Sequence, residues 1–148
     1  MNLLSHRSRL QIVTPKRMTP YLKQEVLALG YPVVNETVMG VETEGTLHDA
    51  MRLNLHLRTG HRVLFFLDEF RADSPEHLYR GIRGFDWENY LDADGYLSVN
   101  SYAEHASVTD TRFPNLKAKD AIVDRMTAKR GRRPDSGRGL RQRLRDTR

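Results

Sequence analysis

The residues that most often carry out chemistry occur in this chain without the spacing that catalysis or metal binding needs. The chain has no cysteine, which excludes thiol catalysis, disulfides and cysteine-ligated metal sites. Its six histidines show neither the H-x-H nor the H-E-x-x-H spacing that is typical of local zinc sites. The sequence also lacks the G-x-S-x-G turn of serine nucleophiles and the G-x-x-x-x-G-K loop that binds phosphates. We therefore expect no catalytic residue and no metal site in this chain.

The positive charge of the chain is concentrated at its C-terminal end. The chain holds 24 lysines and arginines against 19 aspartates and glutamates, a formal net charge of +5 at pH 7. Residues 128–148 contain nine of the basic residues and two of the acidic ones, so the first 127 residues carry 15 basic against 17 acidic groups. A basic surplus of this kind suggests a polyanionic partner, and it is a property of the tail rather than of the folded part.

Length and composition describe a globular protein of modest size. With 148 residues, 39% of them hydrophobic and 29% charged, the chain has room for one ordinary domain or two small ones. No apolar run approaches the roughly 20 residues that span a bilayer, so we expect no membrane contact. Residues 1–10 lack the apolar core and small-residue cleavage site of a secretory signal, which predicts a cytoplasmic protein.

The first block of the chain shows the signals of six short elements. These are a strand at 11–14, a helix from the predicted N-cap Thr19 and Pro20 to Gly30, strands at 33–36 and 41–43, a helix from Thr46 to Thr59-Gly60, and a strand within 62–70. The order β-α-β-β-α-β predicts a ferredoxin-like domain, with two helices on one face of a four-stranded antiparallel sheet. Residues 63–67 are apolar at every position, so we expect that strand to be buried on both faces and the second block to pack against it.

The second block begins with another helix start, at Ser74-Pro75. We expect this helix to reach about Ile82, a short helical turn at 86–91, and a strand at 96–102 with alternating apolar residues. A longer helix is predicted from about residue 115 to residue 129, with Ala118, Ile122 and Met126 on its buried face. The hydrophobic periodicity stops after Gly137.

An ordered set of motifs runs through both blocks. It comprises residues 51–64 (MRLNLHLRTGHRVL), Glu76 with Leu78-Tyr79, Asp86-Trp87 with Tyr90-Leu91, Arg112-Phe113, residues 119–124 (KDAIVD), and Gly131-Arg132-Arg133-Pro134. Over about residues 10–137 this set resembles the N-terminal region of THUMP-domain class I RNA methyltransferases, of the type that modifies guanine amino groups of ribosomal RNA. In that family a ferredoxin-like domain precedes an RNA-binding THUMP domain, and a domain that binds S-adenosylmethionine follows.

The resemblance implies an α+β chain with a ferredoxin-like βαββαβ block followed by an incomplete THUMP-type α/β block. The expected parts are a leader at 1–9, the ferredoxin-like domain at 10–72, a partial THUMP-like domain at 73–134 and a basic disordered tail at 135–148. The family often has a Pro-Arg/Lys-Gly-Leu-Glu segment where this chain has residues 15–19 (PKRMT), and it continues with strands where this chain becomes arginine-rich. We interpret the chain as a truncation, through a frameshift in the coding sequence.

The expected role is RNA binding without methyl transfer. The chain lacks the Asp/Asn-Pro-Pro-aromatic motif of amino-methyltransferases and a glycine-rich cofactor loop, so S-adenosylmethionine is expected in the full-length family and no cofactor in this chain. The implied partner is RNA, in particular ribosomal RNA. The candidate contact residues are Arg112, Phe113, Lys117, Lys119, Lys129, Arg130, Arg132 and Arg133.

Each candidate contact has a structural alternative. Asp120 and Asp124 alternate with the basic residues of the long helix, including Arg125, so a solvated, ion-paired face fits the pattern as well as a phosphate contact does. A phenylalanine such as Phe113 is more often a core residue than a stacking platform, and Trp87 is more often a packing anchor. The alternative function is a protein-interaction module whose ferredoxin-like sheet docks a separate methyltransferase subunit.

Overall fold

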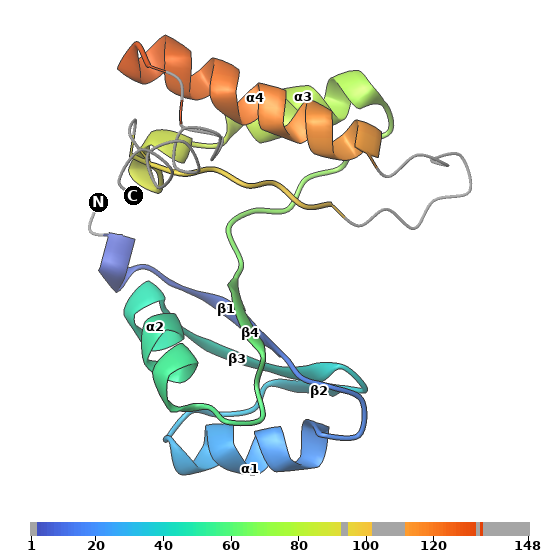
Figure 1. The fold of residues 1–148 in the computed structure, drawn as a ribbon, viewed down its shortest axis with the longest axis vertical. Coiled ribbons are helices and arrows are strands. Elements are labelled where there is room, and N and C mark those ends of the chain that lie inside the picture. The colour runs from blue at the N-terminus through green and yellow to red at the C-terminus, as the bar shows by residue number, and fades with distance from the viewer. Residues whose placement is uncertain (1–2, 93–94, 102–111, 133, 135–148) are drawn as a thin grey trace, which may run out of the picture. The chain divides into compact units, whose positions relative to one another are not determined.

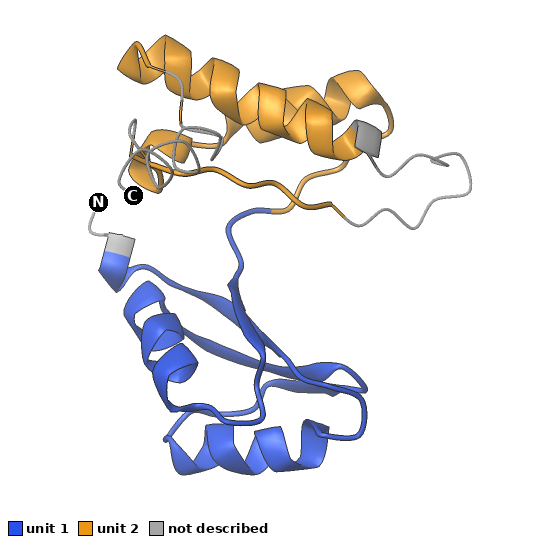
Figure 2. Cartoon of the chain, viewed as in Figure 1, with its two compact units in different colours: residues 1–68 blue, residues 69–148 orange. Residues whose placement is uncertain are grey.

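The computed structural model describes residues 3–92, 95–101, 112–132 and 134 (Figure 1). The chain divides into two compact units, unit 1 over residues 1–68 and unit 2 over residues 69–148 (Figure 2). The arginine-rich tail at 135–148 lies outside the described residues. Among the described residues, no helix combines the length and the apolar character needed to cross a membrane.

Unit 1 has the strand order of the ferredoxin-like fold. Its elements are the short 3-10 helix η1 (Leu3–Ser5), β1 (Arg7–Val13), α1 (Thr19–Ala28), β2 (Asn35–Thr37), β3 (Gly40–Thr46), α2 (Leu47–His56) and β4 (Arg62–Phe65). The strands are arranged β2-β3-β1-β4, and each neighbouring pair is antiparallel. The predicted α+β class and ferredoxin-like block are confirmed. The first strand begins at Arg7, inside residues 1–9 that the sequence analysis assigned to a leader, because β1 pairs with β3 as far as Arg7↔Thr46.

The core of unit 1 lies between one face of the sheet and its two helices. Along β1 the exposed and buried positions alternate, so that Leu10 and Ile12 are fully buried while Gln11 is exposed. Leu22 of α1 and Leu53 of α2 are also fully buried against this face. Full burial of one such aliphatic side chain contributes about 1.5–3 kcal/mol.

The two helices of unit 1 begin in different ways. Thr46 caps α2 as predicted: its Oγ1 accepts a hydrogen bond from the Asp49 amide (3.2 Å), and its own amide donates to Asp49 Oδ2 (2.8 Å). The prediction that Thr19 caps α1 is wrong, because Met18 holds that position and Thr19 is already helical. The Thr19 hydroxyl instead lies 3.2 Å from the carbonyl oxygens of Thr37 and Val38. It therefore ties α1 to the β2–β3 turn.

The strand β4 is not buried on both faces, which corrects the expectation for residues 63–67. It lies at the edge of the sheet, and its side chains alternate between half-buried Val63 and Phe65 and exposed Leu64. Leu64 is 42% exposed, and Phe66 and Leu67, which follow the strand, are 36% exposed. The uninterrupted apolar run therefore marks an edge with one open face. The expected packing of the second block on this strand stays a prediction.

The described part of unit 2 consists mainly of helices. Its elements are α3 (Pro75–Gly84), the 3-10 helix η2 (Trp87–Asn89) and α4 (Arg112–Arg130). Ser74 caps α3 as predicted, accepting a hydrogen bond from the His77 amide at 3.2 Å. Residues Ala118, Ile122 and Met126 of α4 are buried, as their spacing predicted. The helix begins three residues before the predicted start, so Phe113 lies inside it rather than ahead of it.

The predicted strand at 96–102 does not form in the part of the chain that the structure describes. Tyr96 makes a single isolated β-bridge, residues 97–101 have no regular structure, and Tyr102 lies outside the described residues. A strand needs a neighbour to accept and donate its backbone hydrogen bonds. The pattern correctly predicted that more and less exposed side chains alternate in this segment. The described residues of unit 2, however, offer no neighbouring strand to pair with it.

Candidate nucleic-acid interface

The candidate contact residues lie on α4 and just after it. Arg112 and Phe113 form the start of the helix, but their side chains lie outside the described part of the structure, and so does Arg133. Lys117, Lys119, Lys129, Arg130 and Arg132 are described.

Lys117 and Lys119 do not face the same way. Residues two apart on an α-helix point about 200° from each other around its axis. Lys117 faces α3, where its Nζ lies 5.9 Å from the centroid of the Tyr79 ring. Lys119 shares its side of the helix with Arg130 instead, because eleven residues complete about three turns and a rise of about 16 Å. One RNA strand lying along α4 could therefore meet Lys119 and Arg130, but not Lys117 as well.

The C-terminal end of α4 carries a group of exposed basic residues. Lys129, Arg130 and Arg132 are all exposed there. Arg130 Nη2 donates a hydrogen bond to the backbone oxygen of Glu88 at 2.9 Å, which holds the end of α4 against η2. Basic residues at this position also stabilise the helix itself, because its C-terminus carries partial negative charge. We call Lys129, Arg130 and Arg132 the α4 terminus.

The Arg125 side chain bonds to other residues of unit 2 and is not available to a ligand. Its Nε and Nη2 donate to the two carboxylate oxygens of Glu88 at 2.8 and 2.7 Å, and it also pairs with Asp86. Its Nη1 donates to the backbone oxygens of Arg83 and Gly84 at 3.1 and 3.0 Å. The side chain is only 14% exposed. Arg125 is therefore ion-paired, but with Glu88 and Asp86 rather than with Asp120 or Asp124 of its own helix, and it does not belong to a solvated face.

The pairing of Arg125 with Glu88 is strong enough to shift the ionisation of both groups. The hydrogen bonds from the Arg125 guanidinium lower the pKa of Glu88 from 4.5 to about 2, and burial only partly opposes them. The same hydrogen bonds raise the pKa of Arg125. Bidentate hydrogen bonds between arginine and a carboxylate are among the strongest hydrogen bonds in proteins. The pair therefore braces α4 against the segment that follows α3.

Other motif residues of unit 2 also act as braces. The Tyr79 hydroxyl of α3 donates to Asp124 Oδ2 of α4, and this bond raises the pKa of Tyr79. Trp87 Nε1 donates to the backbone oxygen of Ile82 at 2.6 Å. The Trp87 ring meets Phe85 edge-on, with centroids 4.8 Å apart. These contacts make Trp87 a packing anchor.

Unit 1 brings together two loops that the sequence analysis did not connect. The loop at 15–18 leaves β1, and the loop at 57–61 enters β4. Thr14 Oγ1 donates to the Thr59 backbone oxygen at 2.6 Å, and the His61 amide donates to the Val13 oxygen at 2.8 Å. The signal was available in the predicted topology, since in neighbouring antiparallel strands the end of one lies beside the start of the other.

The described residues offer no metal site. Among them, no group of three or more histidine, aspartate or glutamate side chains could hold a metal ion.

Comparison with protein families and known sequences agrees with the fold of unit 1. The model of the RlmL ferredoxin-like domain matches residues 9–64. The ribosomal RNA large subunit methyltransferase K/L of Methylococcus capsulatus is 39% identical over 120 residues, which cover 81% of this chain and 16% of that protein. The protein of the same name in Pseudomonas aeruginosa is 36% identical over 123 residues, or 83% of this chain and 17% of that protein. The chain thus spans less than a fifth of the length of these relatives.

Solved structures share the fold of both units. The crystal structure of SMU.472 in complex with SAH matches with a TM-score of 0.76 at 23% identity, covering 88% of this chain and 36% of that one. An N6-adenine-specific DNA methylase predicted in Listeria monocytogenes matches with a TM-score of 0.68 at 27% identity, covering 86% of this chain and 33% of that one.

S-adenosylmethionine, the methyl donor of such enzymes, does not fit the described residues. Dinucleotide-type cofactors in open α/β folds bind at the carboxyl ends of parallel strands, beside a glycine-rich turn. The described sheet pairs its strands antiparallel throughout. Gly40 lies so close to the Ile12 carbonyl that an added Cβ would clash with it, so this glycine serves the packing of β3 on β1. No step of methyl transfer is therefore assigned to these residues.

The identity of the chain follows from unit 1 and from the relatives together. The ferredoxin-like strand order is present, the RlmL domain model covers nearly all of that sheet, and the sequence match to the large-subunit enzymes continues beyond it into unit 2. Residues 9–64 match the model of the RlmL ferredoxin-like domain, and the chain is homologous to the N-terminal part of the ribosomal RNA large subunit methyltransferases K/L.

Proposed function

We propose that this chain is the RNA-binding, THUMP-type portion of a methyltransferase that acts on guanine amino groups of ribosomal RNA. It supplies affinity and position for the RNA, and a catalytic domain in the same or a separate chain supplies the chemistry. The named activity of the relatives supports the RNA substrate. The chain spans 16% of the length of the Methylococcus relative, so the catalytic step is not assigned to it in this proposal.

The observation that carries this proposal is the α4 terminus. It presents exposed basic side chains, whereas Arg125 in the same helix is bound internally. In the sequence the basic run continues beyond it, because residues 128–148 hold nine basic and two acidic groups. Such a group neutralises phosphates whatever the base sequence, and each contact releases counterions. The expected affinity is therefore strongly dependent on salt.

RNA binding by the full chain and by a chain that ends at residue 127 tests the proposal. We expect the shorter chain to lose most of its affinity for a ribosomal RNA fragment and to show a flatter dependence of log K on log salt. Because the deletion removes the last turn of α4, a full-length Lys129→Gln/Arg130→Gln variant is measured beside it. Arg7→Gln/Arg52→Gln, which removes the same charge from unit 1, is the matched control. Equal affinity and slope for all four proteins would show that the α4 terminus does not bind RNA.

One observation favours the protein-interaction alternative. Leu64 is exposed on the edge strand β4, and Phe66 and Leu67 follow it. An exposed apolar edge is typical of a surface that pairs with another protein. Under this alternative, the separately produced C-terminal part of the Methylococcus relative would bind the wild-type chain in sedimentation velocity and would not bind Leu64→Glu. If it binds neither, the edge strand is not a dock for that domain.

A further inference from the structure

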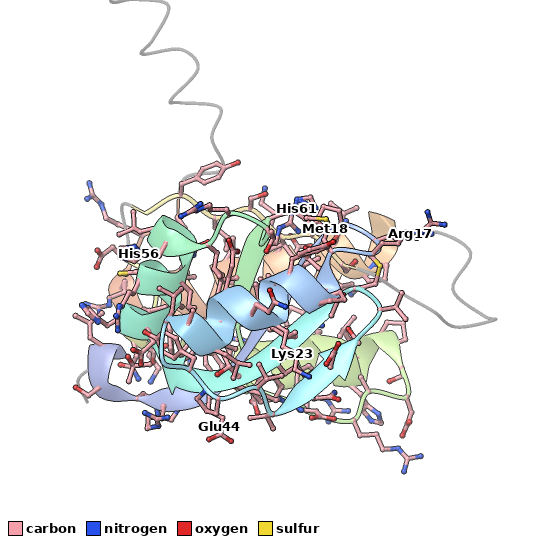
Figure 3. All side chains as sticks on the ribbon, turned by 90° about the horizontal axis from the view of Figure 1, so that it is seen from below. Arg17, Met18, Lys23, Glu44, His56 and His61 are labelled. Atoms are coloured by element: carbon pink, nitrogen blue, oxygen red, sulfur yellow. The ribbon has the colours of Figure 1, made fainter. Side chains whose placement is uncertain are left out.

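The end of the unit 1 sheet where β1 stops and β4 starts concentrates basic side chains on two adjoining loops. Lys16 and Arg17 lie on the first loop, and Arg58, His61 and Arg62 lie on or beside the second. All five side chains are exposed. Residues 15–18 and 57–62 contain no aspartate or glutamate. Figure 3 shows Arg17, Met18 and His61 at the same end of α1. We call this surface the basic end.

Hydrogen bonds within unit 1 hold the two loops in place. The Glu25 carboxylate of α1 accepts hydrogen bonds from the Arg58 amide (3.1 Å), the Thr59 amide (3.0 Å) and the Thr59 hydroxyl (2.8 Å). Burial opposes the ionisation of Glu25, but the bonds from Thr59 and Arg58 outweigh it and lower the pKa of this carboxyl. The charge of Glu25 is thus engaged in fastening the second loop, and the five basic side chains remain exposed.

Beside the basic side chains lies an open hollow with an aromatic wall. Its volume is about 470 Å³, and it is lined by Met18, Tyr21, Gln24, Glu25 and Thr59. Tyr21 is 59% exposed, so one face of its ring is available to a ligand. This volume is in the range of sites that hold small organic groups. Proteins hold single-stranded nucleic acid by stacking bases on aromatic rings and by placing basic side chains along the phosphates. Tyr21 offers such a ring, and Arg17 and Arg58 directly adjoin Met18 and Thr59 of the hollow in the sequence.

The backbone of the first loop is strained at Arg17. Arg17 has φ 71°, a left-handed conformation that costs a side-chain-bearing residue free energy and that glycine adopts without strain. An arginine at such a position is held there by the tight turn, in which the Met18 amide donates to the Pro15 oxygen at 3.1 Å. The turn therefore presents a charged side chain where an uncharged glycine would be easier to accommodate.

From these four observations we infer that the basic end is a second RNA-binding surface, which holds the phosphates of a single-stranded segment and stacks one base on Tyr21. This inference rests on the proposed function and adds a site in unit 1, where none of the eight candidate contact residues lies. The absence of acidic residues from both loops favours a polyanion over a protein partner. The open hollow favours single-stranded RNA, because a base within a helix is not free to enter it.

The test uses the full chain and a fluorescein-labelled single-stranded RNA dodecamer, with binding followed by anisotropy at several salt concentrations. Arg17→Gln/Arg58→Gln removes two charges from the basic end, and Arg7→Gln/Arg52→Gln removes two exposed charges outside it. We expect the first variant to bind about tenfold more weakly and to lose about 1.4 from the slope of log K against log salt, since each single-strand phosphate contact contributes about 0.7. The second variant should change affinity less than about twofold.

The aromatic contact is tested separately. Tyr21→Phe keeps a ring for stacking and should bind as the wild type does, whereas Tyr21→Ala should bind about fivefold or more weakly. Photo-crosslinking of a 4-thiouridine version of the dodecamer should label the peptide that contains Tyr21. Circular dichroism of each variant shows that unit 1 is folded, and Lys16→Gln/Arg62→Gln replaces the first double variant if that one unfolds.

The possible failures can be told apart. If the wild-type chain does not bind the dodecamer, the proposed function fails and this inference fails with it. If the wild type binds but both arginine pairs have equal effects, or Tyr21→Ala binds normally and no crosslink reaches Tyr21, the basic end is not an RNA site. The proposed role of the α4 terminus would stand in that case.

Discussion

Unit 1 and unit 2 are stabilised in different ways. In unit 1 the central strand β1 pairs on both sides, and it places Leu10 and Ile12 in an apolar core shared with both helices. In unit 2, within the described residues, α4 buries an apolar face, but α3 and η2 contribute no buried side chain, and Arg125 and Tyr79 join the three elements by polar contacts. A packed core resists acid and salt, whereas a polar brace depends on the charge of its members. We therefore expect unit 2 to open first.

The largest effect is expected from removing core volume in unit 1. Leu10→Ala should lower the free energy of unfolding of unit 1 by about 3–4 kcal/mol, because the site is enclosed by a sheet and two helices and cannot collapse. Urea unfolding followed by far-ultraviolet circular dichroism measures the loss. The exposed Leu64→Ala on the same sheet should cost less than about 1 kcal/mol. Equal losses for the two variants would mean that the core is not where the structure places it.

The next effect is expected in the brace of unit 2. Arg125→Gln leaves the Glu88 carboxylate without its partner and should destabilise unit 2 by about 2–3 kcal/mol. Fluorescence of Trp87, the chain's only tryptophan, reports unfolding of this unit directly. Lys119→Gln removes one charge from the same helix and should have little effect. If the Arg125–Glu88 pair contributes no stability, the two variants should unfold at the same urea concentration.

Acid should increase the difference in stability between the two units. Because the pKa of Glu88 is lowered from 4.5 to about 2, its pairing contributes stability that is complete above pH 4.5 and is lost as the pH falls toward 2. The loss should reach about 3 kcal/mol. Glu25 and Asp49 of unit 1 also have lowered pKa values, but the apolar core remains when they are protonated.

The measurement is the Trp87 fluorescence during an acid titration, compared with circular dichroism of the whole chain. We expect the fluorescence change to come at higher pH than the loss of the sheet signal. Arg125→Gln should flatten the fluorescence titration between pH 4.5 and about 2. Coincident transitions in both proteins would contradict a separate, charge-dependent unit 2.

A smaller difference should be visible without any mutation. Amides of residues 116–128 in α4 should exchange with solvent at least about tenfold faster than those of residues 10–12 in β1, because α3 and η2, which α4 contacts, bury no side chain of their own. Residues 63–65 of β4 should be intermediate, since this strand lies at the edge. Hydrogen exchange followed by mass spectrometry resolves the three segments. Equal protection of α4 and β1 would show that unit 2 is stabilised by more than its brace.

The smallest effect concerns S-adenosylmethionine, which should not stabilise either unit. Addition of S-adenosylmethionine should leave the thermal midpoints of both units unchanged, because the described residues offer no cofactor site. Calorimetric detection of stoichiometric binding would contradict this expectation. It would also show that a residue range outside the described part holds the cofactor.

Local sequence signals were sufficient for most elements. The start of α2 at Thr46, the Ser74-Pro75 start of α3 and the end of α1 before Gly30 each depend on residues within about one turn of each other. The helical spacing of Ala118, Ile122 and Met126 likewise correctly predicted a buried face. The order of these elements was enough to predict the ferredoxin-like sheet, because few topologies accommodate that order.

Only the tertiary structure decided which distant residues meet. Arg125 and Glu88 are 37 positions apart, and Thr14 and Thr59 are 45 apart, so no local pattern could show that one arginine is a brace and that two basic loops adjoin. The same holds for the apolar run at 63–67, which lies at an edge, and for residues 97–101, which have no strand partner among the described residues. The sequence by itself determined what each segment can form, since that depends on neighbours along the chain. Burial, strand pairing and the availability of a charge depend on neighbours in space, and these are set by the fold.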